Sequence, residues 1–209
     1  MKTPPRLSLS RLHFPVTALG PGRRLGLWLQ GCSRRCPGCL SPEAWEFTGN
    51  FTTVDHLMTA LQPWLNRCDG LTVSGGEPFD QCDGLLALLE RFRQKSAGDI
   101  LVFTGYYFEE IEPLLQDRPG LIDALMCGPY DPGQPQTLAL RGSDNQRLHP
   151  LTELGRCNFA SYDRLRRPDE QCFDLVLDES GGPAWLAGIP LAKDLPRLRE
   201  VLAGQGLRK

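Results

Sequence analysis

The stretch LGLWLQGCSRRCPGC, residues 25–39, joins a predicted strand to a loop that holds three cysteines. Residues 25–30 form a short apolar run, which is typical of a strand buried in a sheet. Cys32, Cys36 and Cys39 then follow within eight residues. Because reactive groups in α/β proteins collect at the carboxyl ends of strands, this junction indicates both a fold class and the place of a site.

Helix-like and strand-like patterns alternate after this junction. Apolar residues recur at helical spacing over 53–66 and 81–95, whereas 71–74 and 99–104 are short apolar runs. The remaining patterns predict a helix at 108–116, strands at 121–126 and 137–141, an irregular segment at 157–172, a hairpin at 173–189 and a closing helix at 193–202. Such alternation indicates crossover units and a parallel sheet.

We therefore expect an α/β fold, a partial (incomplete) TIM-like barrel of about five or six parallel strands with outer helices. The stretch 8–16 is expected to pair with 25–30 through a turn at residues 20–22, which read Gly-Pro-Gly. Residues 1–150 would form the core, with the cysteine loop at 31–40. Residues 151–209 would form a small C-terminal extension.

Composition narrows the function classes. The 209 residues are 41% hydrophobic, which suits one globular domain with a small appendage. A formal net charge of −2 gives no broad basic field, so nucleic acid is not expected as a partner. No apolar run is long enough to span a bilayer, and residues 1–15 lack the apolar segment of a signal peptide. We expect a cytoplasmic protein without a membrane partner.

The cysteine spacing suits an open metal site. Three thiolates can hold three corners of a four-iron cluster, which leaves the fourth iron free to bind a substrate. A structural zinc site needs a fourth ligand, commonly from a second Cys-x-x-Cys pair, and the sequence has no such pair. The spacing alone therefore favours an iron–sulfur site but leaves zinc open.

Three further unusual loops follow the next predicted strands. They are Ser74-Gly75-Gly76-Glu77-Pro78, Thr104-Gly105-Tyr106 and Cys127-Gly128-Pro129-Tyr130. A Gly-Gly pair after a strand is, by itself, more often a tight turn than a binding loop. Four such loops at one edge of a sheet make a site more credible than any one of them would.

These motifs, taken in order, resemble a known family. Cys-x3-Cys-x2-Cys at 32–39, the Gly-Gly-Glu loop, the Thr-Gly-Tyr loop and RGSDNQ at 141–146 are similar to those of the radical S-adenosylmethionine (SAM) superfamily. Within it they resemble the activating proteins of anaerobic ribonucleotide reductase, which are glycyl radical enzyme activases. The resemblance covers about residues 10–150.

The resemblance implies a set of roles. Cys32, Cys36 and Cys39 would bind a 4Fe-4S cluster, with no catalytic residue beyond the cluster and the SAM site. The residues that would contact S-adenosyl-L-methionine are Gly75, Gly76, Glu77, Thr104, Ser143 and Asn145. The activity implied is reductive cleavage of SAM to a 5′-deoxyadenosyl radical, which takes a hydrogen atom from a backbone glycine of a partner glycyl radical enzyme. A flavodoxin or ferredoxin would supply the electron.

Several features depart from that family and keep alternatives open. The residue after the third cysteine is usually aromatic and is Leu40 here, and the segment after 150 exceeds the short activases. Cys157 and Cys172 are candidate ligands for a second cluster, although scattered cysteines are more often structural. The alternatives are a radical SAM enzyme that modifies a small molecule or peptide, and a non-enzymatic iron–sulfur or zinc protein.

Overall fold

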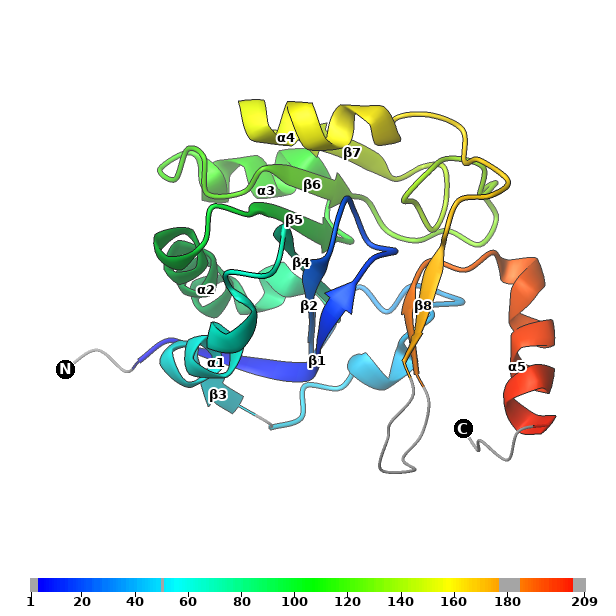
Figure 1. Ribbon diagram of the computed structural model, residues 1–209, viewed down its shortest axis with the longest axis horizontal. Coiled ribbons are helices and arrows are strands. Elements are labelled where there is room, and N and C mark those ends of the chain that lie inside the picture. Colours follow the sequence, from blue (N-terminus) through cyan, green and yellow to red (C-terminus); the bar gives the residue numbers. More distant parts are fainter. Residues whose placement is uncertain (1–3, 50, 177–184, 205–209) are drawn as a thin grey trace.

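The computed structural model describes residues 4–49, 51–176 and 185–204, and its centre is a seven-stranded sheet (Figure 1). The strands in spatial order are β3 (Phe51–Thr53), β1 (Arg6–Val16), β2 (Arg24–Leu29), β4 (Gly70–Gly75), β5 (Asp99–Thr104), β6 (Ala124–Cys127) and β7 (Arg147–Pro150). No helix in these ranges is long and apolar enough to cross a membrane.

The sheet is parallel at its centre and antiparallel at both margins. Strands β2, β4, β5 and β6 are parallel neighbours, so the predicted mixed α/β architecture is confirmed. Four strands run parallel instead of five or six, because β1 reaches β2 by a tight turn and β7 follows β6 without a crossover helix. The predicted pairing of 8–16 with 25–30 is confirmed, and a partial barrel stays a prediction.

One predicted strand is wrong and two strands, β3 and β7, were missed. Residues 137–141 form only an isolated bridge, between Leu138 and Leu165. The pairing partner of β6 is instead β7, at 147–150, which lay between two predicted segments. Part of the segment that was predicted to be irregular is helical, up to Phe159.

Four helices follow the predicted pattern with shifted ends, and α4 was not predicted. The helices are α1 (Val54–Leu61), α2 (Cys82–Lys95), α3 (Phe108–Leu115), α4 (Glu153–Phe159) and α5 (Leu195–Gly204), with 3-10 turns at Pro42–Ala44, Gln62–Trp64, Pro78–Gln81, Ala160–Tyr162 and Ala192–Asp194. The Thr53 hydroxyl caps α1 by accepting the His56 N–H. Helix α1 ends at Leu61, earlier than predicted, and the chain continues as the 3-10 turn Gln62–Trp64, because Pro63 has no N–H with which to extend the α-helical hydrogen bonds.

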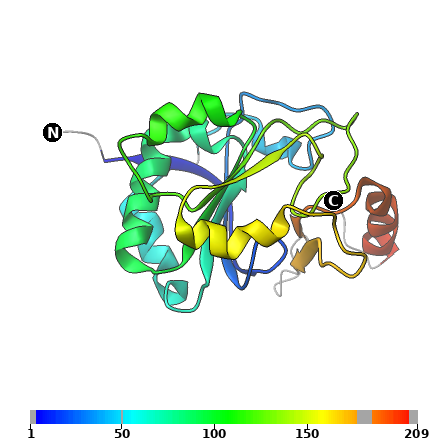
Figure 2. The same cartoon turned by 90° about the horizontal axis from the view of Figure 1, so that it is seen from above.

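The two faces of the sheet bury different partners. Leu25, Leu27 and Leu29 alternate along β2 and pack into the cluster that includes apolar residues of α1 and α2. On the other face, Phe159 of α4 packs against Leu101 and other strand residues. Figure 2 shows α1, α2 and α3 on one side of the sheet, with α5 and the hairpin of β8 (Phe173–Val176) and β9 (Trp185–Gly188) on the other. The predicted hairpin is confirmed, although its turn at 177–184 lies outside the described residues.

A buried ion pair ties the strands to α4. The Arg24 side chain is 0% exposed, and its Nη2 lies 2.5 Å from Asp99 Oδ1. Arg24 Nε also donates to the Thr72 hydroxyl, and Asn158 of α4 donates to the other Asp99 oxygen. Burying two charges is costly unless each is fully hydrogen-bonded, and this network meets that condition.

Removing one partner of this pair should therefore destabilise the fold. We expect Asp99→Ala to lower the free energy of unfolding by about 3–5 kcal/mol, because Arg24 would keep a buried, unpaired charge. Urea unfolding measures the change. The control is Asp55→Ala, which breaks the exposed pair with Arg91 and should cost less than about 1 kcal/mol. Equal effects of the two substitutions would contradict this account.

Candidate metal centre

A cavity of about 190 Å³ lies at the carboxyl ends of the parallel strands. It brings together seven of the nine predicted site residues, namely Cys32, Cys36, Cys39, Gly75, Gly76, Glu77 and Thr104. The last residues of β4 and β5 and the loops after β2 and β4 supply all seven, as expected from the parallel order of these strands.

The other two predicted residues brace the loop beside this cavity. Ser143 is fully buried and accepts the Asp131 N–H, while Asn145 donates its side-chain amide to the Pro129 carbonyl. Their neighbours Gly142 and Gln146 line the cavity. A role for Ser143 and Asn145 in binding SAM stays a prediction.

Burial and nearby backbone groups act in opposite directions on two cysteine thiols. Burial raises the pKa of Cys32 and of Cys36. The backbone N–H groups of Arg34 and Arg35 near Cys32, and of Tyr130 near Cys36, oppose that rise. A bound cation would favour the thiolate forms further, since metals bind cysteine as thiolate.

The Gly-Gly-Glu loop is packed directly on the cysteine loop. The Gly76 N–H donates to the Leu29 carbonyl at 2.7 Å, and the Glu77 N–H donates to the Gly31 carbonyl at 2.8 Å. A Cβ at Gly76 would lie 2.1 Å from the Gly31 oxygen, so only glycine fits there. Gly76 is thus needed to hold two loops together, whatever ligand the cavity takes.

Glu77 is a buried carboxylate on the cavity wall. Its side chain accepts hydrogen bonds from the Phe79 N–H, the Thr104 hydroxyl and the Gly105 N–H. Burial raises the pKa of Glu77 from 4.5 to about 7, although these three bonds favour the charged form. Because the Thr104 hydroxyl donates to Glu77, the structure links two predicted site residues, one at the end of β5 and one in the loop after β4.

Asp80 holds the cysteine loop, and sequence reasoning missed it. Its carboxylate accepts the Ser33 N–H at 2.7 Å, the Ser33 hydroxyl at 2.9 Å and the Tyr106 hydroxyl at 2.9 Å. The Arg34 guanidinium lies over the Tyr106 ring, 4.8 Å from its centre. The only sequence signal was that Asp80 follows the Gly-Gly-Glu loop, because its contacts are made far along the chain.

The donor set fits an iron–sulfur cluster. Three thiols share one cavity, and the Cys39 sulfur accepts the Ser41 N–H at 3.4 Å. Such N–H bonds to sulfur are typical around iron–sulfur clusters. In the described ranges, no three His, Cys, Asp or Glu side chains form a group that fits a single metal ion. Cys157, exposed on α4, and Cys172, next to β8, belong to no such group among the described residues.

Comparison with known proteins identifies the family. Residues 18–149 match the family described as a 4Fe-4S single cluster domain. The anaerobic ribonucleoside-triphosphate reductase-activating protein of Escherichia coli K12 is 33% identical over 149 residues, which cover 66% of this chain and 96% of that protein. The chain belongs to this family of activating proteins. The activating protein of Enterobacteria phage T4 is 34% identical over 146 residues, covering 64% of this chain and 88% of that protein.

One solved structure is distantly similar. The crystal structure of QueE from Escherichia coli gives a TM-score of 0.42 at 16% identity, covering 48% of this chain and 53% of that one. This level of similarity is too low to support an argument about fold or function. The assignment to the activating proteins therefore rests on the sequence matches.

Glu77 should make the stability of the metal-free protein depend on pH. Because its pKa is raised on folding, the free energy of unfolding should fall as pH rises from 4.5 to about 7. The loss is at most about 3 kcal/mol, and above pH 7 the full penalty of the buried charge is present. Urea unfolding at pH 5 and pH 8 should show a smaller difference for Glu77→Gln than for the wild type. An identical difference would contradict the assignment.

Asp80 should be a positioning residue for the cysteine loop. Asp80→Ala removes the acceptor for both Ser33 bonds, so we expect the reconstituted variant to lose bound iron several times faster to a chelator. Asp83→Ala, an exposed change one turn further on, is the matched control. Absorbance of the cluster in the presence of the chelator follows the loss. Equal rates for the two variants would remove this role from Asp80.

Proposed function

We propose that the protein is a radical SAM enzyme that activates a glycyl radical enzyme such as anaerobic ribonucleotide reductase. The observation that carries the proposal is the shared cavity of Cys32, Cys36 and Cys39 with the Gly75–Glu77 loop. Metal-ligating thiols and an acidic group beside them are what a metal-bound amino acid end of SAM requires. Membership of the activating-protein family supports the choice of substrate class.

In this proposal the three cysteines that line the cavity would hold a 4Fe-4S cluster. Reductive cleavage of SAM to methionine and a 5′-deoxyadenosyl radical is the chemistry that the bound cluster supplies. The chain itself binds and orients SAM, and keeps water from the reacting atoms.

Glu77 is the proposed partner of the SAM ammonium group. Its Oε1 already accepts two hydrogen bonds, from Phe79 and Thr104, whereas Oε2 accepts one, from Gly105. Oε2 therefore has a free acceptor position. A cation placed there would favour the charged carboxylate and offset part of the cost of burying it. The backbone of Gly75 and Gly76 would line the same end of SAM.

The proposed partner is a protein with a backbone glycine that loses a hydrogen atom. The relatives are named as activating proteins of a reductase, and this chain spans nearly their whole length. A flavodoxin or ferredoxin is the proposed electron donor, and a cytoplasmic location is part of the same proposal. The division into a core at 1–150 and an extension at 151–209 also remains a proposal.

One observation favours a second candidate, a radical SAM enzyme that modifies a small molecule or peptide. Ile189 lines the candidate cavity, although it lies well beyond residue 149, where the family match ends. A cavity wall that includes a segment outside the family match provides contacts that would select a different substrate. The anaerobic assay below, run without any partner protein, separates the two candidates from a non-enzymatic role.

The test is anaerobic reconstitution with iron and sulfide, followed by SAM and a strong reductant. We expect 5′-deoxyadenosine and methionine, detected by mass spectrometry, and about four irons per chain. Cys36→Ala should lower both the iron content and the deoxyadenosine at least about tenfold, because a cluster ligand is lost. Cys68→Ala, whose thiol lies outside the cavity, is the control and should keep both. Full activity in Cys36→Ala would contradict the cluster assignment.

A further inference from the structure

The C-terminal hairpin reaches the candidate cavity. Its last strand, β9, ends at Gly188, and the next residue, Ile189, lines the cavity together with the cysteine and Gly-Gly-Glu loops. The family match ends at residue 149. The hairpin is therefore a part of the cavity wall that the matched family region does not include.

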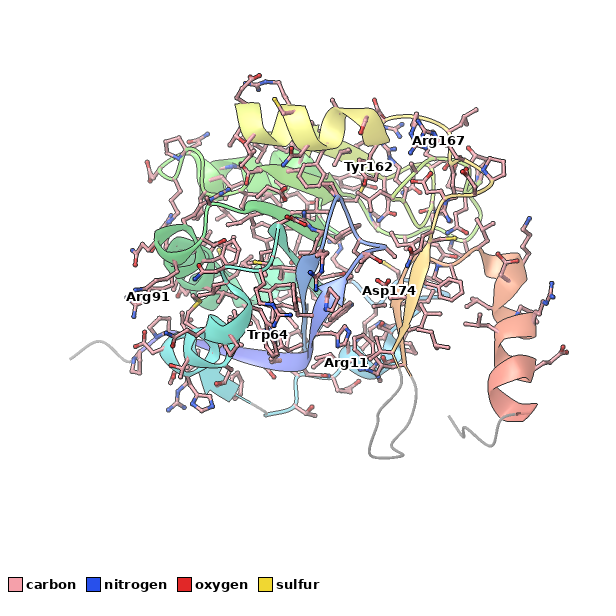
Figure 3. All side chains as sticks on the ribbon, in the orientation of Figure 1. Arg11, Trp64, Arg91, Tyr162, Arg167 and Asp174 are labelled. Atoms are coloured by element: carbon pink, nitrogen blue, oxygen red, sulfur yellow. The ribbon has the colours of Figure 1, made fainter. Side chains whose placement is uncertain are left out.

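Asp174 anchors the hairpin to the turn after β1. Its carboxylate accepts the Thr17 N–H at 2.8 Å, the Thr17 hydroxyl at 2.6 Å and the Ala18 N–H at 3.1 Å. Figure 3 shows Asp174 on β8 beside the turn that joins β1 to β2. Three hydrogen bonds to one carboxylate fix the direction in which the hairpin leaves the sheet.

Apolar packing joins the hairpin to the sheet below this anchor. Ala187 is 0% exposed and packs with Val16 and Leu19. The Trp185 ring meets the Trp28 ring edge to face, with their centres 5.3 Å apart. These contacts show that apolar side chains, as well as hydrogen bonds, hold the hairpin on the sheet.

The backbone at Ile189 is fixed from both sides. Its N–H donates to the Cys172 carbonyl at 2.6 Å. Arg166 donates to the Ile189 carbonyl at 3.1 Å and, through its other terminal nitrogen, to the Arg141 carbonyl at 3.2 Å. Arg166 thus joins the end of the hairpin to the loop that carries Gly142, another residue of the cavity wall.

The cavity has polar groups and a separate apolar pair. Glu77, Arg34 and the cysteines supply its charge and its metal ligands, whereas Ile189 and Phe103 of β5 belong to one hydrophobic cluster. If the amino acid end of SAM is held by the metal and Glu77, its uncharged nucleoside part is what remains for an apolar surface. An apolar wall gains most by covering a ring that would otherwise contact water.

We propose that Ile189 is a ligand-contacting residue that packs against the nucleoside part of SAM, so that the C-terminal hairpin completes the cofactor site. The inference rests on the proposed function and adds a contact from outside the matched family region. The hairpin would then set the width of the site as well as cover one face of the sheet. Its fixed backbone means that this wall is present before the ligand binds.

The test compares substitutions at Ile189 in the full chain after anaerobic reconstitution. Equilibrium dialysis with SAM measures the dissociation constant, and iron content is measured on the same samples. Ile189→Ala should weaken SAM binding about tenfold, because the apolar contact is lost. Ile189→Trp should weaken it further, because the larger ring would occupy the same space. Leu175→Ala, on the same hairpin and 43% exposed, is the matched control and should bind like the wild type.

The outcomes separate this proposal from the proposed function. Wild-type affinity in both Ile189 variants, with iron retained, would overturn the contact while leaving the radical SAM assignment intact. Loss of iron in Ile189→Ala would also overturn it, since the residue would then support the loop instead of the ligand. A wild-type protein that holds iron but does not bind SAM would overturn both. If Ile189→Trp fails to fold, the alanine variant decides alone.

Discussion

The close packing of the Gly-Gly-Glu loop on the cysteine loop is the constraint on which the rest of the site depends. Two backbone hydrogen bonds, from Gly76 to Leu29 and from Glu77 to Gly31, fix the end of β4 against the end of β2. The missing side chain at Gly76 makes this distance possible. As a result, groups that follow separate strands face one cavity. Asp80 extends the same constraint by holding Ser33 from the turn that follows Glu77.

Burial of Glu77 carries an energetic cost in this arrangement. A glutamate side chain in water is charged at neutral pH. Glu77 is only 1% exposed, and this burial raises its pKa to about 7. Natural proteins tolerate such costs where function requires the group. An ammonium group beside Glu77 would offset part of this cost, so binding of a cationic ligand and stability of the fold are coupled at this residue. The buried Arg24–Asp99 pair is different, because each of its charges is already compensated within the protein.

Local patterns in the sequence predicted the central strands, the crossover helices and the loops that carry the candidate site. The apolar run along β2 and the spacing of Cys32, Cys36 and Cys39 depend on neighbours in the chain, which is why they could be recognised in the sequence. Three features depend on residues far apart in sequence. They are the pairing of β7 with β6, the hydrogen bonds from Ser33 to Asp80, and the position of Ile189 in the cavity wall. No local pattern specifies such contacts. Ser143 and Asn145 illustrate the same limit, because their loop was found but their orientation within it was not.

The most direct test of the central claim is radical transfer to a protein partner. The reconstituted protein would be mixed anaerobically with SAM, a reductant and an anaerobic ribonucleotide reductase, and electron paramagnetic resonance would be recorded. The account predicts a glycyl radical on the reductase that appears only when SAM is present. Formation of 5′-deoxyadenosine without any radical on the reductase would contradict activation of that partner and favour a small-molecule or peptide substrate.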